Sequence, residues 1–333
     1  MARPTDSQGT LFELPAHHLR AAEQATELCE LAAALPDTVR FGGMSWTYPG
    51  WLGSVYGVAA SEKQLAAHGL PAYAKHPLLR SVEIDRSYYE PLSADALAGY
   101  AAQVPDDFRF FVKAHEDCTV LRFPLQARYG KKRGLDNARF LDPEYAARAV
   151  VEPVVRGLGA KLGAILFQFS PQDMGGPGAF VSRLHAFLSR LPGGIAYAVE
   201  LRNAELFTRD YGAALADAGA LHCHNVWTGM PTIPTQARLI PPAARRPLLV
   251  RWLLRQDDRY QEAMARFSPF HELREPDLEN RGQVADLVAR AHQHDVPVTV
   301  LVDNKAEGNA PASIAELARA LVHRLAGPHQ HGG

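Results

Sequence analysis

Charged and amide side chains occur near the carboxyl-terminal ends of several short apolar segments of this chain. These residues are Glu83, Asp85, Lys113, His115, Gln168, Glu200, Arg202, Arg251, Asp303 and Asn304. Side chains two apart on a strand share a face, so Glu83 is expected beside Asp85. Because burying a charge without a partner is costly, such a set predicts either a functional site or an ion-pair network that plugs one end of the fold.

Three of these residues have the chemistry of general acid–base catalysis. Two carboxylates in unequal environments can serve as base and acid, and we assign Glu200 and Glu83 to these roles. Lys113 would stabilise developing negative charge. The expected catalytic residues are therefore Glu83, Lys113 and Glu200.

Other residues are expected to bind the substrate. Arg202 and Arg251 would hold an anionic group, while Gln168 and Asn304 would orient the substrate by hydrogen bonds. The first two loops after strands are rich in aromatic residues, among them Trp46 and Tyr48. Such rings either stack on a sugar or a base, or simply pack the loops down.

A basic segment follows the third apolar run. Residues 122–133 carry five cations and no acidic residue, and the connection of about fifty residues that contains them exceeds a usual strand-to-helix loop. It is interpreted either as a lid that binds an anion such as a phosphate or as a solvated surface loop. As a lid it would contribute the substrate-binding cations Arg128, Lys131, Lys132 and Arg133.

His222 and His224 flank Cys223 in another apolar run and suggest a metal site. Both histidines would share a strand face, and Glu83 or Glu200 could complete the ligand set. The alternative is one core histidine and one histidine at the site, each making hydrogen bonds. Since no distant ligand motif matches, we expect no metal and no cofactor.

Eight apolar runs must position these groups. They are Val39–Trp46, Ser81–Ser87, Phe108–Ala114, Gly163–Phe169, Ala196–Arg202, Ala220–Val226, Leu248–Leu254 and Val298–Asn304. Helical patterns are predicted at His18–Leu35, Ser61–Lys75, Ser93–Gln103, Pro143–Leu158, Pro177–Arg190, Phe207–Ala218, Asp277–His294 and Pro311–Leu325. Alternating strands and helices predict an α/β fold with a parallel sheet, and eight strands favour a (β/α)8 TIM barrel, in which the carboxyl ends of the strands surround one site. The alternative is a doubly wound open sheet, although no glycine-rich dinucleotide motif follows any run. Residues 227–247 show no clear helix.

The amino-acid composition disfavours some classes of protein. The 333 residues contain 35 Lys and Arg against 36 Asp and Glu, which disfavours a polybasic nucleic-acid binder but leaves room for a local basic patch. Three cysteines without a shared motif predict no disulfide framework. No secretory signal or membrane-spanning run is evident. We expect a cytoplasmic protein with a single barrel domain at residues 18–326, between flexible tails at residues 1–17 and 327–333.

Several of these segments resemble one family. They are Trp46-Thr47-Tyr48-Pro49-Gly50-Trp51, Val82-Glu83-Ile84-Asp85, Phe108-Arg109-Phe110-Phe111-Val112-Lys113, Leu166-Phe167-Gln168-Phe169, Ala198-Val199-Glu200-Leu201-Arg202 and Asp303-Asn304. Together they are similar to the YecE-like family, domain of unknown function 72, over about residues 39–325. The resemblance implies a TIM barrel without a settled activity. It also implies functional importance for Glu83, Lys113, Gln168, Glu200, Arg202, Arg251 and Asn304.

The chain departs from the family pattern at two histidines. Val120 follows Thr119 where a histidine is common, and Leu253 stands in the seventh run where the pattern has a histidine. If those histidines transfer protons in other members, this chain either uses His115, His224 or a carboxylate instead or lacks that activity.

Three functions follow as hypotheses. The leading one is an enzyme that performs metal-independent acid–base chemistry on a small anionic substrate containing a sugar or phosphate. The second is a barrel that binds or cleaves nucleic acid through its basic loop. The third is a non-catalytic protein that binds a metabolite.

Overall fold

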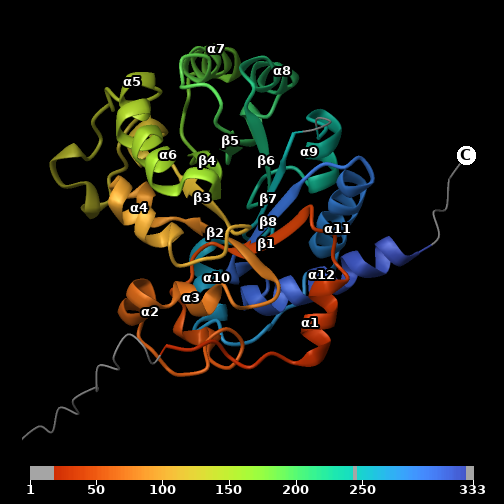
Figure 1. The fold of residues 1–333 in the computed structure, drawn as a ribbon. Coiled ribbons are helices and arrows are strands. Elements are labelled where there is room, and N and C mark those ends of the chain that lie inside the picture. Colours follow the sequence, from red (N-terminus) through yellow and green to blue (C-terminus); the bar gives the residue numbers. More distant parts are fainter. Residues whose placement is uncertain (1–18, 243–245, 328–333) are drawn as a thin grey trace, which may run out of the picture.

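Eight parallel strands close into a barrel in chain order in the computed structural model, which describes residues 19–242 and 246–327 (Figure 1). The strands are β1 Val39–Gly43, β2 Leu79–Ile84, β3 Arg109–Lys113, β4 Leu162–Phe169, β5 Tyr197–Leu201, β6 Leu221–Val226, β7 Leu248–Trp252 and β8 Val298–Val302. Each predicted apolar run overlaps one strand, and β2 and β4 begin two residues and one residue before their predicted runs. Because β1 pairs in parallel with β8, the sheet has no free edge, and the TIM-barrel prediction is confirmed while the open-sheet alternative is wrong.

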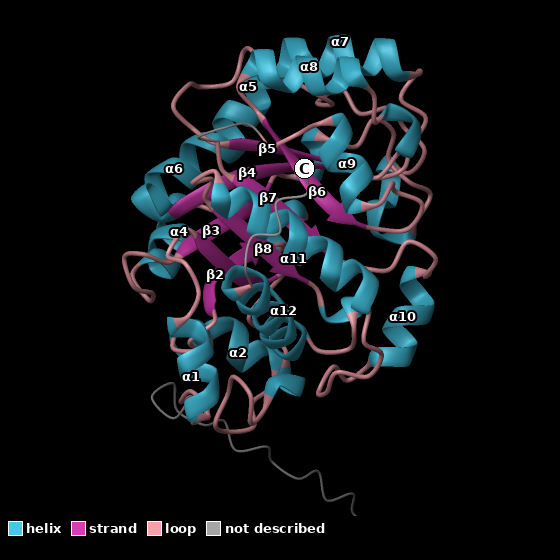
Figure 2. Cartoon of the chain, turned by 90° about the vertical axis from the view of Figure 1, so that its right-hand side faces the viewer, coloured by secondary structure: helices cyan, strands magenta, loops and turns pink. Residues whose placement is uncertain are grey.

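Helices surround the barrel (Figures 1 and 2). They are α1 Thr26–Ala33, α2 Glu62–His68, α3 Leu70–Tyr73, α4 Ala94–Ala101, α5 Pro143–Ala146, α6 Glu152–Leu158, α7 Pro177–Leu188, α8 Arg209–Ala218, α9 Ile233–Leu239, α10 Tyr260–Phe267, α11 Leu278–Gln293 and α12 Ala310–Ala326. None of the described helices is sufficiently long and apolar to cross a membrane.

Some predicted helices have different limits. The helix expected from His18 covers only Thr26–Ala33, and His18 itself lies outside the described residues. The helix expected over residues 61–75 is divided at Gly69 into α2 and α3, and Pro71 lies in the first turn of α3. A proline has no N–H to continue a helix but fits its first turn, which explains the division.

Two helices were not predicted. The segment between β6 and β7 was expected to lack a helix, yet it contains the seven-residue α9, with Pro234 in its first turn. The eight-residue α10 follows β7. Both are so short that they span only about two helical turns, and apolar periodicity needs a longer window to be recognised.

Two apolar cores hold the barrel together. The larger lies between strands and helices and includes Val82, Phe167 and Ile314. The smaller lies inside the barrel and includes Phe111, Leu166 and Leu301. Alternate residues of each strand therefore face opposite sides, as strand geometry requires. The interior core ends where the charged residues begin, so those residues lie at the barrel mouth formed by the carboxyl ends of the strands.

The tail predicted at residues 1–17 lies outside the described residues, as do residues 328–333 of the tail predicted at 327–333. Gly327, which was assigned to the second tail, is described and follows the end of α12.

Candidate functional site

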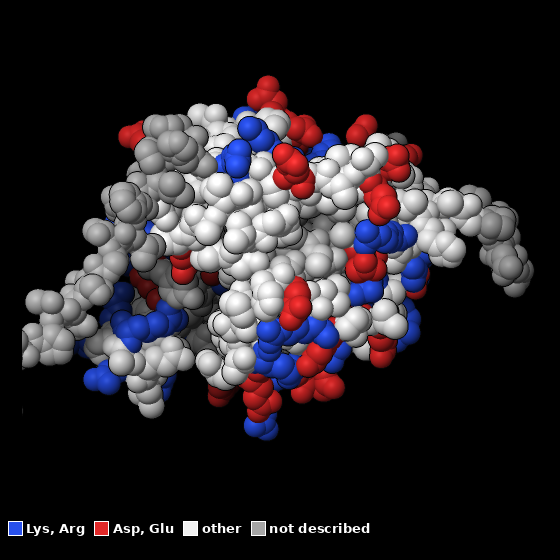
Figure 3. All heavy atoms as spheres, turned by 90° about the horizontal axis from the view of Figure 1, so that it is seen from below, with Lys and Arg blue, Asp and Glu red and all other residues white. Residues whose placement is uncertain are grey.

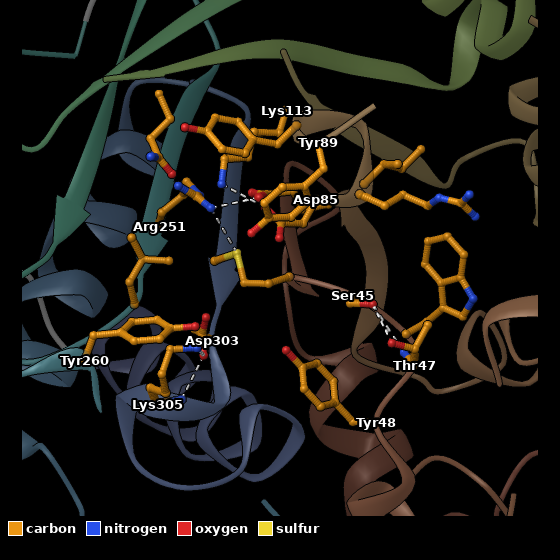
Figure 4. A pocket seen from close by; sticks show the side chains of 18 of the residues that line it. Ser45, Thr47, Tyr48, Asp85, Tyr89, Lys113, Arg251, Tyr260, Asp303 and Lys305 are labelled. Atoms are coloured by element: carbon orange, nitrogen blue, oxygen red, sulfur yellow. Dashed lines mark hydrogen bonds and ion pairs between the residues drawn. The ribbon is translucent and has the colours of Figure 1, made fainter. Parts of the chain in front are cut away.

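A cavity of about 680 Å³ opens at the barrel mouth. Every strand contributes to its wall at or just beyond its carboxyl end, through Met44, Glu83, Lys113, Gln168, Arg202, Trp227, Arg251 and Asp303. Figure 4 shows polar side chains approaching the cavity from several directions, with Lys113, Asp85 and Arg251 on one side and Ser45, Thr47 and Tyr48 on another. The predicted gathering of polar side chains at one mouth is thus present, and the ion-pair network does not fill it.

Arg251 connects two buried glutamates across the barrel interior. Its Nη2 donates to Oε1 of Glu83 at 2.8 Å, and its Nη1 donates to Oε2 of Glu200. All three side chains are almost fully buried. Since the ion pairs are shielded from water, both glutamates depend on Arg251 for compensation of their charges.

The two glutamates have opposite pKa shifts. Burial raises the pKa of Glu83 to about 7, against the opposing effect of Arg251. Burial would also raise the pKa of Glu200, but Arg251 and Arg202 outweigh it and lower the pKa to about 2. At neutral pH Glu200 is therefore ionised, while the protonated and ionised forms of Glu83 are both populated. The expected separation of the two pKa values is present.

Their positions differ as well. Glu83 lines the cavity, and its Oε2 is buried without a hydrogen-bond partner among the described residues. Glu200 does not line the cavity, because Arg202 Nε donates to its Oε1 at 2.8 Å and Arg251 occupies its Oε2. Glu83 is thus available to a ligand, whereas Glu200 holds two arginines in position.

Lys113 and Lys305 are each held by a carboxylate and an aromatic ring. Lys113 Nζ donates to Asp85 at 2.8 Å and lies 4.2 Å from the centroid of the Tyr88 ring. Lys305 Nζ donates to the carboxylate of Asp303 at 2.6 Å (Figure 4). Both lysines line the cavity, and one bond to a carboxylate leaves two of the three ammonium donors of each for a ligand.

Arg202 lies over an aromatic ring beside the cavity. Its guanidinium is 3.7 Å from the ring centroid of Trp227, and Nε is bound to Glu200. Among the described residues, neither Nη atom of Arg202 has a protein hydrogen-bond partner. The side chain is fixed at one edge and free at the other.

Gln168 also has an unused polar atom at the cavity. Its Nε2 donates to Ser170 Oγ at 3.0 Å, while its Oε1 is buried and has no partner within the described part of the chain. Gln168 pairs in register with Glu200 on the neighbouring strand. Gln168 Oε1 is therefore available for the predicted hydrogen bond with a substrate.

Asn304 has a different place from the one predicted. Its Oδ1 accepts from Trp51 Nε1 at 3.0 Å and from the backbone N–H of Ala310 at 2.8 Å, and it does not line the cavity. It ties the loop after β1 to the beginning of α12, so it supports the fold near the mouth instead of contacting a ligand there.

Trp46 and Tyr48 both line the cavity. Trp46 packs edge-on against Tyr100, with ring centroids 5.0 Å apart. Tyr48 packs on Trp51 with its hydroxyl directed into the open space (Figure 4), and burial raises its pKa well above the usual value. These rings pack the loops and border the cavity at once.

Most cations of the basic loop are neutralised locally. Arg128 donates to Glu116 at 3.0 Å, Arg122 pairs with Asp136 at 2.7 Å, and Lys132 lies 3.9 Å from Asp117. The acids are supplied by flanking residues outside the basic run, which is why the run alone overstated the charge. Of the loop cations predicted to bind substrate, Arg128 lines the cavity, and Lys131, Lys132 and Arg133 do not.

The surface charge is mixed as well. In the view of Figure 3, Lys and Arg side chains of the described residues alternate with Asp and Glu. This face thus shows the near balance of charges that the composition gives.

His222 and His224, which were considered as metal ligands, face away from the barrel interior. His222 bonds to Tyr211 of α8 at 3.1 Å and to Gln236 of α9 at 3.3 Å. Cys223 between them belongs to the interior core, so Glu83 and Glu200 lie on the opposite face of the sheet. The ligand set that we considered with these glutamates is wrong, and the described residues contain no group of three or more metal-ligating side chains.

His115 is not placed for proton transfer in the cavity either. Its Nδ1 lies 2.7 Å from the hydroxyl of Tyr145, and His115 is absent from the cavity wall. Of the alternatives for the missing family histidines, a carboxylate remains. Among the carboxylates that line the cavity, Glu83 is fully buried and has an oxygen, Oε2, without a partner in the described part of the chain.

Several cavity residues were given no catalytic or substrate-binding role from the sequence. They are Asp85, Tyr88, Ser170, Trp227, Tyr260, Asp303 and Lys305. Asp85 and Asp303 follow the same rule as the predicted residues, since they come at carboxyl ends of strands. Lys305 lies two residues beyond Asp303 in a short 3₁₀ helix, a position that strand alternation does not reach.

Comparison with known proteins agrees with this fold. A family model described as "Protein of unknown function DUF72" matches residues 40–331. A DUF72 family protein from Enterococcus faecalis V583 superposes with a TM-score of 0.60 at 19% identity, covering 85% of this chain and 95% of that one. One from Thermotoga maritima MSB8 gives 0.57 at 17% identity, covering 85% and 98%. At such identities the likeness concerns the fold. No curated protein matches the sequence.

Proposed function

The chain belongs to the DUF72 family, whose function is unknown, and we propose that it is an enzyme performing general acid–base chemistry without a metal ion on a small anionic substrate bound at the barrel mouth. The observation that carries the proposal is Glu83. This buried carboxyl has one oxygen held by Arg251 and the other free at the cavity, with a pKa of about 7. A general acid or base works best when its pKa lies near the working pH.

The remaining roles follow from the contacts. Lys113, Arg202 and Arg251 would bind the anionic group and stabilise negative charge in the transition state. Glu200, predicted as the base, is better assigned as a positioning residue, because both of its oxygens accept from arginines. Glu83 then serves as base in one step and as acid in the reverse direction.

The ion pairs around the cavity support a reaction that needs no metal ion. Three of the four carboxylates that line the cavity are already paired with cations: Glu83 with Arg251, Asp85 with Lys113, and Asp303 with Lys305, while Glu62 is the fourth. A divalent cation would have to displace these ammonium and guanidinium groups. No cofactor is part of the proposal.

The nucleic-acid alternative has less support. It depended on the basic loop, where the described cations Arg122, Arg128 and Lys132 each have an acidic neighbour. Oligonucleotide binding at low salt that weakens steeply as salt is added would favour it over a small substrate.

The experiment is a search for proton exchange. The protein is incubated in deuterated water with sugar acids and sugar phosphates, and proton NMR follows the loss of carbon-bound hydrogen and the appearance of products. We expect wild type to exchange or convert one compound class and E83Q to lose this by about 10²–10⁴-fold. E90Q, at an exposed glutamate outside the cavity wall, is the control and should keep the activity.

Unchanged activity in E83Q would contradict the proposal. Tight binding without any conversion would instead support the non-catalytic metabolite-binding alternative.

A further inference from the structure

Arg202, Glu83 and Gln168 present complementary unused groups to one cavity. From them we infer that the ligand is a polyhydroxylated carboxylate, that is, a sugar acid. Its carboxylate is bound by Arg202, and its hydroxyls donate to Glu83 and Gln168. The inference rests on the proposed function only in taking this cavity as the substrate site.

Arg202 is built as a carboxylate fork. Glu200 fixes its Nε, and Trp227 covers one face of the guanidinium at 3.7 Å from the ring centroid. A ligand can therefore approach the guanidinium along the edge that carries its two Nη atoms. A planar carboxylate fits this edge with two parallel hydrogen bonds, and the preorganised side chain loses little freedom on binding.

The floor of the cavity needs hydrogen-bond donors. Glu83 Oε2 and Gln168 Oε1 are both buried without partners among the described residues. A buried acceptor left unpaired costs about 1–3 kcal/mol relative to a paired one. Ligand hydroxyl groups can satisfy both acceptors, whereas a plain phosphate ion, with oxygens that are mainly acceptors, supplies few donors.

The charges at the mouth favour a single negative charge on the ligand. Five of the six cations that line the cavity are paired with protein carboxylates: Lys113 with Asp85, Lys305 with Asp303, Arg128 with Glu116, Arg202 with Glu200, and Arg251 with Glu83 and Glu200. The sixth, Arg86, donates to the hydroxyl of Tyr100. The positive charge is therefore largely compensated before a ligand enters. A dianionic phosphate ester would bring a second charge that few of these groups are free to balance.

The cavity rim suits the remainder of such a molecule. Tyr89 and Tyr260 line the cavity and are 57% and 44% exposed, and Figure 4 shows them on different sides of the opening. Aromatic faces pack against the C–H surface of a sugar while leaving its hydroxyls free to make hydrogen bonds.

The test is titration calorimetry on the full chain with four matched six-carbon ligand classes. These are sugar acids such as gluconate and glucuronate, glucose 6-phosphate, neutral glucose, and hexanoate. We expect at least one sugar acid to bind about tenfold or more tightly than each of the other three classes. Equal or tighter binding of the phosphate ester or of hexanoate, or no binding of any sugar acid, would overturn the inference.

Variants locate the contacts. R202K keeps the charge but loses the fork, so it should weaken sugar-acid binding by about tenfold. Q168L should weaken the sugar acid but not hexanoate. K131M removes a cation of the basic loop outside the cavity wall and should bind as wild type does. Thermal unfolding checks that each variant is folded. If R202K does not fold, the comparison of ligand classes on wild type still tests whether the ligand is a sugar acid. An R202K protein that is folded and binds the sugar acid unchanged would reject the assignment.

The outcome separates this inference from the proposed function. A sugar acid that binds through Arg202 but undergoes no exchange dependent on Glu83 would leave the ligand class standing and remove the catalytic role. Conversion of a sugar phosphate with no binding of sugar acids would do the opposite.

Discussion

Nη2 of Arg251 donates to Oε1 of Glu83 at 2.8 Å, which joins β7 to β2 through the barrel interior. The contact leaves the second oxygen of Glu83 free at the cavity. One interaction thus stabilises the barrel and orients the group that we propose for proton transfer.

Removal of Arg251 is expected to destabilise the protein strongly. R251M leaves the buried Glu83 and Glu200 without compensation, and breaking a buried pair in this way costs about 3–5 kcal/mol. The free energy of unfolding is measured in urea. R319M is the control, since Arg319 pairs with Glu316 at the surface, where such a pair contributes about 0–1 kcal/mol. Similar losses in both variants would contradict the role of Arg251.

The variant E83Q should change how stability depends on pH. Burial raises the pKa of Glu83 from 4.5 to about 7. The stability that Glu83 contributes to the folded state is therefore fully present below pH 4.5 and is lost as the pH rises through 7. Glutamine stays neutral throughout. Relative to E83Q, wild type should therefore lose on the order of 3 kcal/mol across this range. Urea unfolding at several pH values measures it, and a constant difference between the proteins would show that Glu83 titrates normally.

His224 is expected to make the protein sensitive to acid. Both ring nitrogens are buried without partners among the described residues, and burial together with His222 lowers the pKa of His224 well below 6.5. Below pH 6.5 the imidazole of His224 takes up a proton in the unfolded chain but not in the folded protein. The free energy of unfolding therefore falls as the pH drops below 6.5.

In H224L this loss should shrink, because leucine carries no titratable ring, while stability at pH 8 should stay within about 1 kcal/mol of wild type. Thermal unfolding from pH 8 to pH 5 tests it, with H68Q at an exposed histidine as the control. An H224L protein that is less stable than this at pH 8 would indicate a polar contact for His224.

Gly42 is required by the close approach of β1 and β2. A Cβ at this position would lie 2.1 Å from the backbone oxygen of Ser81, so G42A should cost about 1–3 kcal/mol or more. G99A is the matched control. Gly99 lies in α4 with open space around its Cβ position, and alanine there should gain about 0.5–1 kcal/mol. Urea unfolding distinguishes the two, and a neutral G42A would mean that the strands can separate slightly.

The sequence by itself determined the barrel and most of the mouth. Eight short apolar runs alternating with helices predict parallel strands, and parallel strands bring their carboxyl ends to one side. Lys113, Gln168 and Arg202 could be placed there without coordinates, because each lies late in its run. Glu83 and Arg251 stand near the middle of their runs, and the limits of β2 and β7 place them close to the carboxyl ends of their strands. Burial of so many charges also indicated that they must pair with one another.

The tertiary structure decided which atoms are used and which are free. Strand alternation fixes that His222 and His224 share a face, but only the closed barrel shows that this face contacts α8 and α9. The acids that neutralise Arg128 and Lys132 come from another part of the same loop. Glu83 and Glu200 look equivalent in sequence. They acquire different roles because Glu200 faces two arginines and Glu83 faces one, a difference that depends on distances across the barrel between residues far apart in the chain.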